Sequence, residues 1–238
     1  MKNKSLYSKL FVIALCIPAL LCGCSKTEDA AEVAYKQEKE VAEDEITTEE
    51  TFIEETTTQS TPEDLFNAFC EGQISAEARS YYDDATWTMN IGDYQLVSDP
   101  SEESGDVSLM LSKAEPVDLD NDGEPEYVLV NPVYGDMCFD CKDDKVICFA
   151  QGEGTTAYCS FTKYDDAYWI VHSDTIHEGR CTYNLIKFNG NLEVVDSFDF
   201  GWEDWDGDGI KRFYLDDQDI TVAEYEELLN AVIPNPNP

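Results

Sequence analysis

The chain has 238 residues, and its 51 acidic and 15 basic side chains give a formal net charge of −36. This balance argues against nucleic acid as a partner, because that affinity depends on Lys and Arg neutralising phosphates. It also argues against electrostatic docking onto anionic lipid. A domain this acidic repels itself, so divalent cations are the expected compensation. The 13 Tyr, 11 Phe and 4 Trp supply enough apolar mass for a folded core.

Residues 1–23 have the composition of an export signal. Three lysines within the first nine residues make the start positive, and an apolar run from Leu10 to Leu21 follows. The run is too short to cross a bilayer as a helix, which needs about 20 apolar residues. We therefore predict a signal peptide that is removed from the mature protein.

The segment Leu21-Cys22-Gly23-Cys24-Ser25 resembles the lipobox of bacterial lipoproteins. In that family a small residue precedes a cysteine that receives diacylglycerol, so the resemblance implies that Cys24 is lipidated and becomes the mature N-terminus. Cys22 is a weaker candidate because Leu20 and Leu21 give a poor cleavage context, and an ordinary secretory signal is the other alternative. Several acyl chains on one cysteine hold a protein firmly to a lipid bilayer. We expect anchoring at the extracellular face of the cell membrane.

Composition divides the rest of the chain into a stalk, one domain and a tail. Residues 24–61 carry the lipidated cysteine and then a run rich in Glu and Thr that lacks the apolar residues needed to offset chain entropy. This acidic stalk is predicted to be disordered and to lift the domain away from the membrane. Residues 62–233 have the pattern of a β-rich globular domain, and residues 234–238 are expected to be a disordered tail.

Helical patterns mark both ends of the predicted domain. Thr61 as N-cap, Pro62 at the first helical position and Asp64 three residues on form the start of the first helix. Thr221 and Glu224 form a capping box that opens the second helix. The apolar face of this second helix is predicted to contain Val222, Tyr225, Leu228, Leu229 and Val232.

Between the helices, apolar and polar residues alternate with the period of β-strands. The separators, such as Asp165-Asp166 and Asn189-Gly190-Asn191, are typical of hairpins. Because no helical crossovers intervene, the predicted fold class is mainly β (α+β): an antiparallel hairpin meander with an N-terminal and a C-terminal helix packed on it. The predicted strands cover residues 87–91, 127–131, 137–141, 146–150, 158–163, 168–173, 183–188 and 192–198.

The strongest chemical motif runs from Asp118 to Glu126, with the sequence DLDNDGEPE. Carboxylates at its first, third and fifth positions converge when glycine lets the chain turn, and such oxygen ligands suit Ca²⁺. The segment resembles the D-x-D-x-D-G-x-x-D/E calcium loops of integrin-type β repeats more than an EF-hand, because position twelve is Leu129. The resemblance implies side-chain ligands and one carbonyl ligand, from Glu124. The implied side-chain ligands are Asp118, Asp120, Asp122 and Glu126.

A second acidic loop repeats the opening of the first. Asp204, Asp206 and Asp208 have the same spacing, but the ninth position is Arg212, a cation where a ligand is expected. This loop is therefore the weaker metal candidate. The alternative is that the guanidinium replaces the ion and pairs with these aspartates. For the first loop, from Asp118 to Glu126, the alternative to a metal site is an acidic turn exposed to solvent.

Six cysteines remain beyond the signal and the anchor. Outside the membrane an even number permits disulfides, but free cysteines also serve as small buried apolar residues, and the sequence leaves both readings open. The Cys138-x-x-Cys141 pair lies in a predicted strand and lacks a second pair for zinc. The six are Cys70, Cys138, Cys141, Cys148, Cys159 and Cys181.

Two other patterns lack the context that catalysis requires. The GEGTTA segment at 152–157 joins two predicted strands, so no helix N-terminus is available to hold a pyrophosphate. His172 shares a strand face with Tyr168 and Ile170, which predicts a core or hydrogen-bonded histidine rather than a ligand. The sequence contains no G-x-S-x-G, H-E-x-x-H or Walker motif.

Most of the region from Pro62 to Val232 resembles a loosely defined group of lipoproteins from gut Firmicutes. The marks of the resemblance are FCEGQISA at 69–76, the acidic loop leading into a strand, and FYLDDQDIT at 213–221. The resemblance implies an envelope location and no particular activity.

The sequence favours a calcium-binding, non-catalytic binding or display domain rather than an enzyme. The expected partner, besides the bilayer, is an extracellular polymer, peptide or envelope protein, reached through an exposed aromatic patch. The alternative is an extracellular hydrolase that uses a pair of carboxylates. A solute-capturing lipoprotein is disfavoured because the chain shows no βαβ units.

Overall fold

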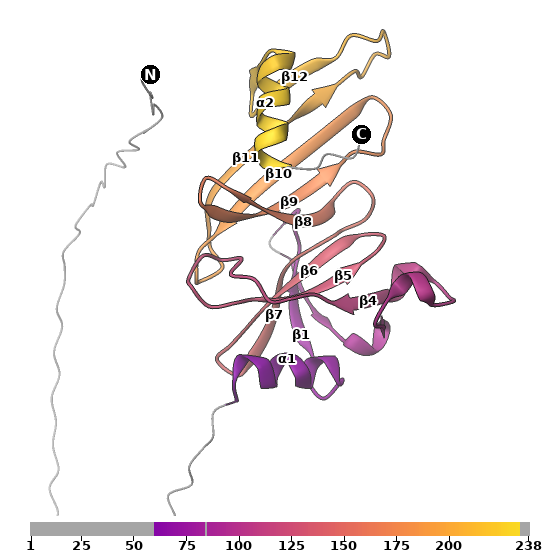
Figure 1. Ribbon diagram of the computed structural model, residues 1–238, viewed down its shortest axis with the longest axis vertical. Helices are drawn as coiled ribbons and strands as arrows, with labels where there is room; N and C mark the ends of the chain where they lie inside the picture. The colour runs from indigo at the N-terminus through magenta and orange to yellow at the C-terminus, as the bar shows by residue number, and fades with distance from the viewer. Residues whose placement is uncertain (1–59, 84, 234–238) are drawn as a thin grey trace, which may run out of the picture. The chain divides into compact units, whose positions relative to one another are not determined.

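The computed structural model describes residues 60–83 and 85–233 (Figure 1). The predicted signal peptide, Cys24, the rest of the stalk and the tail at 234–238 lie outside these residues. Among the helices of the described residues, none combines the length and apolar character that crossing a membrane requires.

The described residues form one mixed sheet of 13 strands with two α-helices, which confirms the mainly β prediction. The helices are α1 (Pro62–Cys70) and α2 (Val222–Val232), with short 3-10 turns at Ile91–Asp93, Pro100–Glu102 and Val107–Leu109. The strands are β1 (Ala76–Arg79), β2 (Thr86–Met89), β3 (Gln95–Leu96), β4 (Met110–Lys113), β5 (Tyr127–Asn131), β6 (Gly135–Lys142), β7 (Lys145–Gln151), β8 (Tyr158–Tyr164), β9 (Ala167–Asp174), β10 (Arg180–Phe188), β11 (Val194–Glu203), β12 (Arg212–Leu215) and β13 (Gln218–Asp219).

Two antiparallel meanders make up most of the sheet. Strands β4 to β7 pair in chain order, and strands β8 to β13 do the same. Three parallel contacts, of β1 with β7, β3 with β4, and β6 with β8, and the antiparallel pairing of β1 with β2 complete the sheet. The contact of β6 with β8 joins the meanders at Gly135 and Cys159. The predicted hairpins are present, whereas the parallel contacts join segments whose local sequence carries no pairing signal.

The tight turns depend on aspartates with positive φ. Asp143 and Asp144, between β6 and β7, have φ of 52° and 58°, and Asp165 and Asp166, between β8 and β9, have 50° and 59°. Two successive positive φ values match the right-handed twist of the flanking strands, and Asp tolerates this region better than most residues. The acidic pairs that raise the net charge therefore also set the hairpin geometry.

The two helices cover different parts of the sheet, and both start at the predicted capping boxes. Helix α1 packs on β6 and β7, where Phe69 lies 5.2 Å from Phe139, centroid to centroid (Figure 1). Helix α2 packs on β8 and β12 and buries Tyr225 and Val232. Val222 was predicted on this buried face but is 50% exposed, because the whole first turn, residues 222–224, is exposed and burial begins at Tyr225.

Candidate metal centre

The first acidic loop joins β4 to β5. Its ends are clamped by a pair of backbone hydrogen bonds, from Val117 N to Glu126 O (3.0 Å) and from Glu126 N to Val117 O (2.9 Å). The chain can close this tightly because Asn121 and Gly123 take φ of 64° and 95°. Both residue types favour the left-handed region, which a β-branched residue would resist.

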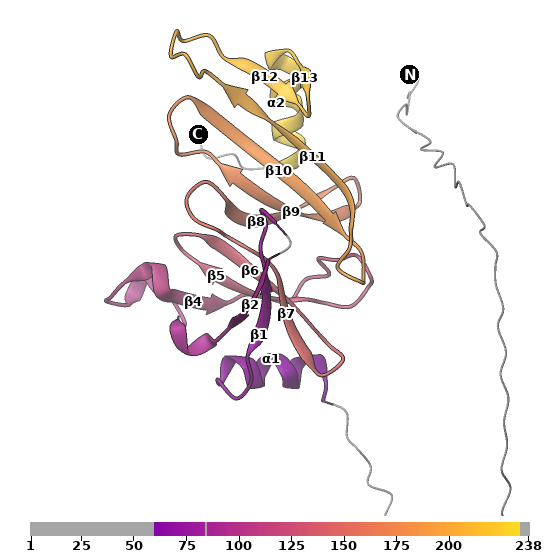
Figure 2. The ribbon, with the colours of Figure 1, turned by 180° about the vertical axis from the view of Figure 1, so that it is seen from behind.

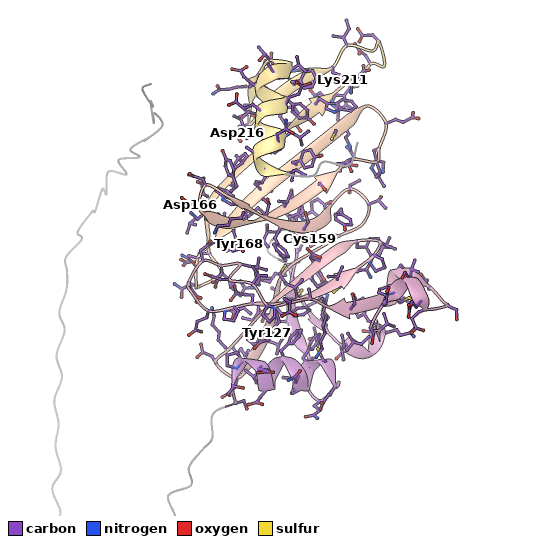
Figure 3. The ribbon with its side chains drawn as sticks, viewed as in Figure 1. Tyr127, Cys159, Asp166, Tyr168, Lys211 and Asp216 are labelled. Carbon is purple, nitrogen blue, oxygen red and sulfur yellow. The ribbon has the colours of Figure 1, made fainter. Side chains whose placement is uncertain are left out.

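The loop is held against the second meander. The Asn121 amide donates to Tyr168 O (3.1 Å), and its oxygen accepts from Tyr168 N (2.8 Å). Figure 3 labels Tyr168 and also Tyr127, the first residue of β5 after the loop. Asp122 packs against Gly190 of the β10–β11 turn so closely that a Cβ on Gly190 would lie 2.7 Å from the Asp122 Cβ. The loop therefore links hairpins that are far apart in sequence.

Three carboxylates of the loop come together. Asp118, Asp120 and Glu126 each place an oxygen within 4.8 Å of the others, and exposed fractions of 0% for Asp120 and 3% for Glu126 show that two of them are buried. Such a cluster of like charges is unfavourable unless protons or a cation compensate.

Backbone N–H groups satisfy only part of this cluster. Glu126 Oε2 accepts from Leu119 N (2.5 Å) and Asp120 N (3.1 Å). Asp118 Oδ2 accepts from Gly123 N (3.2 Å), and Asp120 Oδ1 accepts from Asp122 N (3.2 Å). Two of the three remaining oxygens, Asp118 Oδ1 and Asp120 Oδ2, are buried without a hydrogen-bond partner. Orphaned buried acceptors beside a third carboxylate are what a hard cation would satisfy.

The electrostatics of the loop also favour a cation. Burial and the neighbouring Asp120 and Asp140 carboxylates raise the pKa of Glu126 to about 8, against the N–H groups of Leu119 and Asp120 that hydrogen-bond its charged form. Burial raises the pKa of Asp120 to about 6, and Asp122 and Asp140 add to this. Nearby positive charge comes from Lys142, which pairs with Asp140. The acidic triad can therefore hold a metal ion that would replace bound protons.

The structure places the five predicted ligands in different situations. Asp118, Asp120 and Glu126 form the triad, as their spacing predicted. Asp122 lies outside the triad, where its Oδ1 accepts from Glu124 N (2.8 Å). Both Asp122 and Glu124 are exposed. The ligand roles of Asp122 and of the Glu124 carbonyl stay predictions.

The second acidic loop has the same local geometry. Asp204 Oδ2 accepts from Gly209 N (3.1 Å), and Asp208 Oδ1 accepts from Ile210 N (2.7 Å), as Asp118 and Asp122 do in the first loop. Asp204, Asp206 and Asp208 also place oxygens within 4.8 Å of one another and could hold an ion. Asp206 and Asp208 are exposed, however, and no buried carboxylate corresponds to Glu126. This loop is the more weakly built of the two.

Arg212 does not replace the ion in the second loop, which was the alternative that the sequence left open. Its guanidinium pairs with Glu203 (2.9 Å) and Asp219 (2.6 Å) and so ties β11, β12 and β13 together, rather than neutralising the loop aspartates. The reason is that Arg212 is the first residue of β12, opposite Glu203 in the register, so the side chain follows the sheet.

Three residues near the first loop were not found from the sequence. Asp140 and Lys142 on β6 contribute charge to the triad, and Asn121 holds the loop in place. Asn121 lies inside the motif, but its partner Tyr168 is 47 residues away. Asp140 and Lys142 reach the loop through the pairing of β5 with β6, which the two-residue strand period alone does not reveal.

All six cysteines of the described residues are free. This outcome fits the reading of cysteine as a small apolar residue, because Cys138, Cys141, Cys148 and Cys159 are buried. Cys138 and Cys141 face different core clusters, so the C-x-x-C spacing brings no pair of thiols to one site.

His172 and the tryptophans, which could form the expected exposed aromatic patch, differ in burial. His172 lies in the core with 4% exposure, as predicted. Trp87 and Trp205 are 40% and 67% exposed, and Trp169 is buried. A cavity with a volume of about 650 Å³ is lined in part by Trp87.

No protein-family model matches the sequence, and neither the curated proteins nor the solved structures include a match.

Proposed function

We propose that the chain is a membrane-anchored extracellular lipoprotein whose β domain binds Ca²⁺ at the Asp118–Glu126 loop and serves as a non-catalytic binding or display module. The observation that carries the calcium proposal is the pair of orphaned buried oxygens, on Asp118 and Asp120, beside Glu126. Carboxylate oxygens on a loop suit Ca²⁺, whose coordination geometry is flexible. Mg²⁺ suits them less well, because it demands near-ideal octahedral geometry and keeps most of its waters.

The position of the loop supports a structural role for the ion. Two of the three triad residues, Asp120 and Glu126, are buried, and no residue of the loop lines the cavities of about 650 or 310 Å³, so a substrate in either cavity would not meet the ion. The loop instead joins β4 and β5 to the β8–β9 and β10–β11 hairpins through Asn121 and Asp122. An ion there stabilises the contact between the two meanders.

A groove supports the binding role. Trp87 and Ile74, both at least 36% exposed, line the cavity of about 650 Å³ beside β2, which pairs only with β1. An exposed aromatic side chain next to an unpaired strand edge suits an extended polymer or peptide, because stacking and backbone hydrogen bonds are both available there.

The same groove also holds the carboxylates that the hydrolase alternative requires. Glu77 and Asp144 line it together with Trp87. Both carboxylates belong to exposed residues. A general acid in glycoside hydrolysis needs a desolvated site that keeps it protonated, so the exposure of both groups favours binding over catalysis.

Thermal unfolding tests the calcium proposal. Adding Ca²⁺ to the EGTA-treated protein is expected to stabilise it by about 2.7 kcal/mol when free Ca²⁺ is 100 times Kd. At roughly 2–4 °C per kcal/mol, this raises the Tm by several degrees. Mg²⁺ at the same concentration is expected to give a smaller shift.

The matched variants locate the site. Asp120→Asn removes one charge from the triad without changing its shape and is expected to abolish the Ca²⁺-dependent shift. Asp143→Asn removes the same charge from the exposed β6–β7 turn, where Asn tolerates the positive φ, and is expected to keep the shift. An unchanged Tm in the wild type, or equal shifts in both variants, contradicts the proposal.

Membrane fractionation tests the anchor. Cys24→Ser is expected to release the protein from the membrane fraction, because no acyl chain can then be attached at the lipobox position. Cys22→Ser is the matched control and is expected to stay in the membrane fraction. Release by Cys22→Ser instead would move the lipidation site two residues upstream.

A further inference from the structure

Strand β2 has one edge that no other strand of the described residues pairs with. Strand β7 pairs with β1 in parallel, and β1 pairs with β2 antiparallel, so β2 lies on the side of β1 away from β7 (Figure 2). Three successive residues of β2, Thr86, Trp87 and Thr88, are exposed. An exposed, unpaired strand edge is a template on which another chain can pair.

The register of β1 and β2 shows which backbone groups point outward from this edge. In an antiparallel pair, hydrogen-bonded and non-hydrogen-bonded residue pairs alternate along the strands. Ser80 N donates to Ala85 O (2.9 Å), so Ala85 belongs to a hydrogen-bonded pair, and in the same register Trp87 does too. The N–H and C=O groups of Thr86 and Thr88 therefore point away from β1. They offer two donors and two acceptors to a further strand.

The two faces of β2 set what an added strand should carry. The side chain of Trp87, which is 40% exposed, lies on one face, and those of Thr86 and Thr88 lie on the other. In the register, Thr88 lies opposite Glu77 and Thr86 lies opposite Arg79. An added strand would place an apolar residue beside Trp87, because neighbouring residues of paired strands point to the same face. By the same rule, its residue beside Thr88 would share a face with Glu77.

Carboxylates outnumber basic side chains in the groove that Thr86, Trp87 and Thr88 help to line. Glu77 and Asp144 contribute carboxylates to this groove of about 650 Å³, and Lys145 contributes the basic group. The formal net charge of the chain, −36, adds a long-range field of the same sign as the carboxylates. These charges attract a basic partner and repel a second copy of this chain.

We propose that β2 binds an extended basic peptide segment, which adds to the sheet as a further strand through the backbone groups of Thr86 and Thr88. The peptide places an apolar residue beside Trp87, a lysine or arginine beside Thr88 and a neutral residue beside Thr86, where Arg79 would repel a cation. This inference rests on the binding role in the proposed function and names the partner of that role.

The basic residue of the peptide reaches Glu77 across one intervening strand. Long side chains such as lysine and glutamate span the roughly 10 Å between next-nearest strands. Glu77 already lies 3.7 Å from Arg79, a distance too long for a charge-assisted hydrogen bond, so its oxygens stay available. A polysaccharide suits the edge less well, because it can stack on Trp87 but lacks the regular N–H and C=O groups that pair with a strand.

Fluorescence anisotropy of a labelled peptide with the full chain tests this inference. The probe is a six-residue peptide in which valine alternates with lysine and threonine, and it is expected to bind. The same peptide with glutamate in place of lysine is expected to bind roughly tenfold more weakly. Two further peptides carry backbone N-methyl groups, one at the valines and the other at the lysine and threonine positions. One of them is expected to lose roughly tenfold in affinity and the other little, because only alternate N–H groups face β2.

Three variants of the protein locate the site. Glu77→Lys is expected to reduce the preference for the lysine peptide over the glutamate peptide roughly threefold. Glu227→Lys makes the same change of charge on an exposed position of α2 and is expected to keep the preference. Thr88→Pro removes an outward N–H, which an edge strand tolerates, and is expected to weaken binding roughly tenfold. If Thr88→Pro does not fold, the N-methylated peptides on the wild type decide.

The proposal is overturned by equal affinity for the lysine and glutamate peptides, or by unchanged affinity for both N-methylated peptides. A dimer of the protein that Thr88→Pro dissociates would also overturn it, because a second copy would then occupy the edge. Binding of a cello-oligosaccharide in place of the peptide would keep the binding module of the proposed function and overturn only the peptide partner. Binding of neither would contradict both, and the Ca²⁺-dependent shift in Tm is read independently of all these results.

Discussion

Glu126→Ala is expected to lower the free energy of unfolding in EGTA by about 4 kcal/mol, because two buried N–H groups lose their acceptor and a cavity replaces the side chain. The loss is expected to be larger in Ca²⁺, where the stabilisation by the bound ion is lost as well. The N–H groups are those of Leu119 and Asp120, which both donate to Glu126 Oε2. Glu126 is 3% exposed, so water does not replace the lost acceptor. Urea unfolding in EGTA and in Ca²⁺ measures the change through the midpoint.

Glu126→Gln separates the two roles of this residue. The amide oxygen can accept from the same two N–H groups, so stability in EGTA is expected to stay within about 1 kcal/mol of the wild type. Because burial raises the pKa of Glu126 to about 8, the ion-free wild type already carries a mostly neutral side chain at pH 7, which Gln resembles.

The amide of Gln is a poor ligand for Ca²⁺ compared with a carboxylate, and its NH₂ group would point at the other acids. The Ca²⁺-dependent gain in stability is therefore expected to disappear in Glu126→Gln. If this variant keeps the full gain, Glu126 only holds the loop and is not a ligand. If Glu126→Ala costs less than about 1 kcal/mol, the loop does not depend on it either.

Local features of the fold were predictable because they depend on neighbouring residues. The capping boxes at Thr61 and Thr221 follow from side chains three residues apart. The hairpin at Asp165-Asp166 follows from two successive residues that tolerate positive φ. The parallel contacts of β1 with β7 and of β6 with β8 were not predictable in this way. They join segments that are distant in the chain. The sequence predicts β6, β7 and β8 as separate strands and does not predict β1 as a strand.

The candidate metal centre also has one part that the local sequence predicts and one part that it does not. The convergence of Asp118, Asp120 and Glu126 follows from their spacing around a glycine turn, and the structure brings them together. Burial of the site does not follow from the motif. It comes from the hairpins that carry Tyr168 and Gly190, and from Asp140 on the neighbouring strand. The second loop has a similar motif, but no hairpins bury it. The same spacing of aspartates therefore gives a buried site in the first loop and an exposed one in the second.

His172 is expected to lower the stability of the protein as the pH drops from about 6.5 to about 4, because the buried ring resists the proton that the unfolded chain binds. An unfolded histidine has a pKa of about 6.5, whereas burial lowers the pKa of His172 to about 4. Between these values the unfolded state binds more protons than the folded state, so stability falls with falling pH. The full effect, reached below pH 4, is roughly 3 kcal/mol.

The carboxyl groups of Asp120 and Glu126 act in the opposite direction, because their raised pKa values make the folded state bind protons more readily than the unfolded state. The contribution of His172 is therefore measured as a difference between two proteins. His172→Phe removes the titrating ring and keeps an aromatic partner for Tyr81, so it leaves the carboxyl groups unchanged.

Urea midpoints of both proteins in EGTA, taken from pH 7.5 to pH 4, give this difference. The wild type is expected to lose stability relative to His172→Phe steadily below about pH 6.5, because the unfolded chain binds a proton on His172 that the folded chain does not bind. Parallel curves for the two proteins would mean that His172 keeps an ordinary pKa in the folded state. Its Nδ1 would then be hydrated rather than buried without a partner.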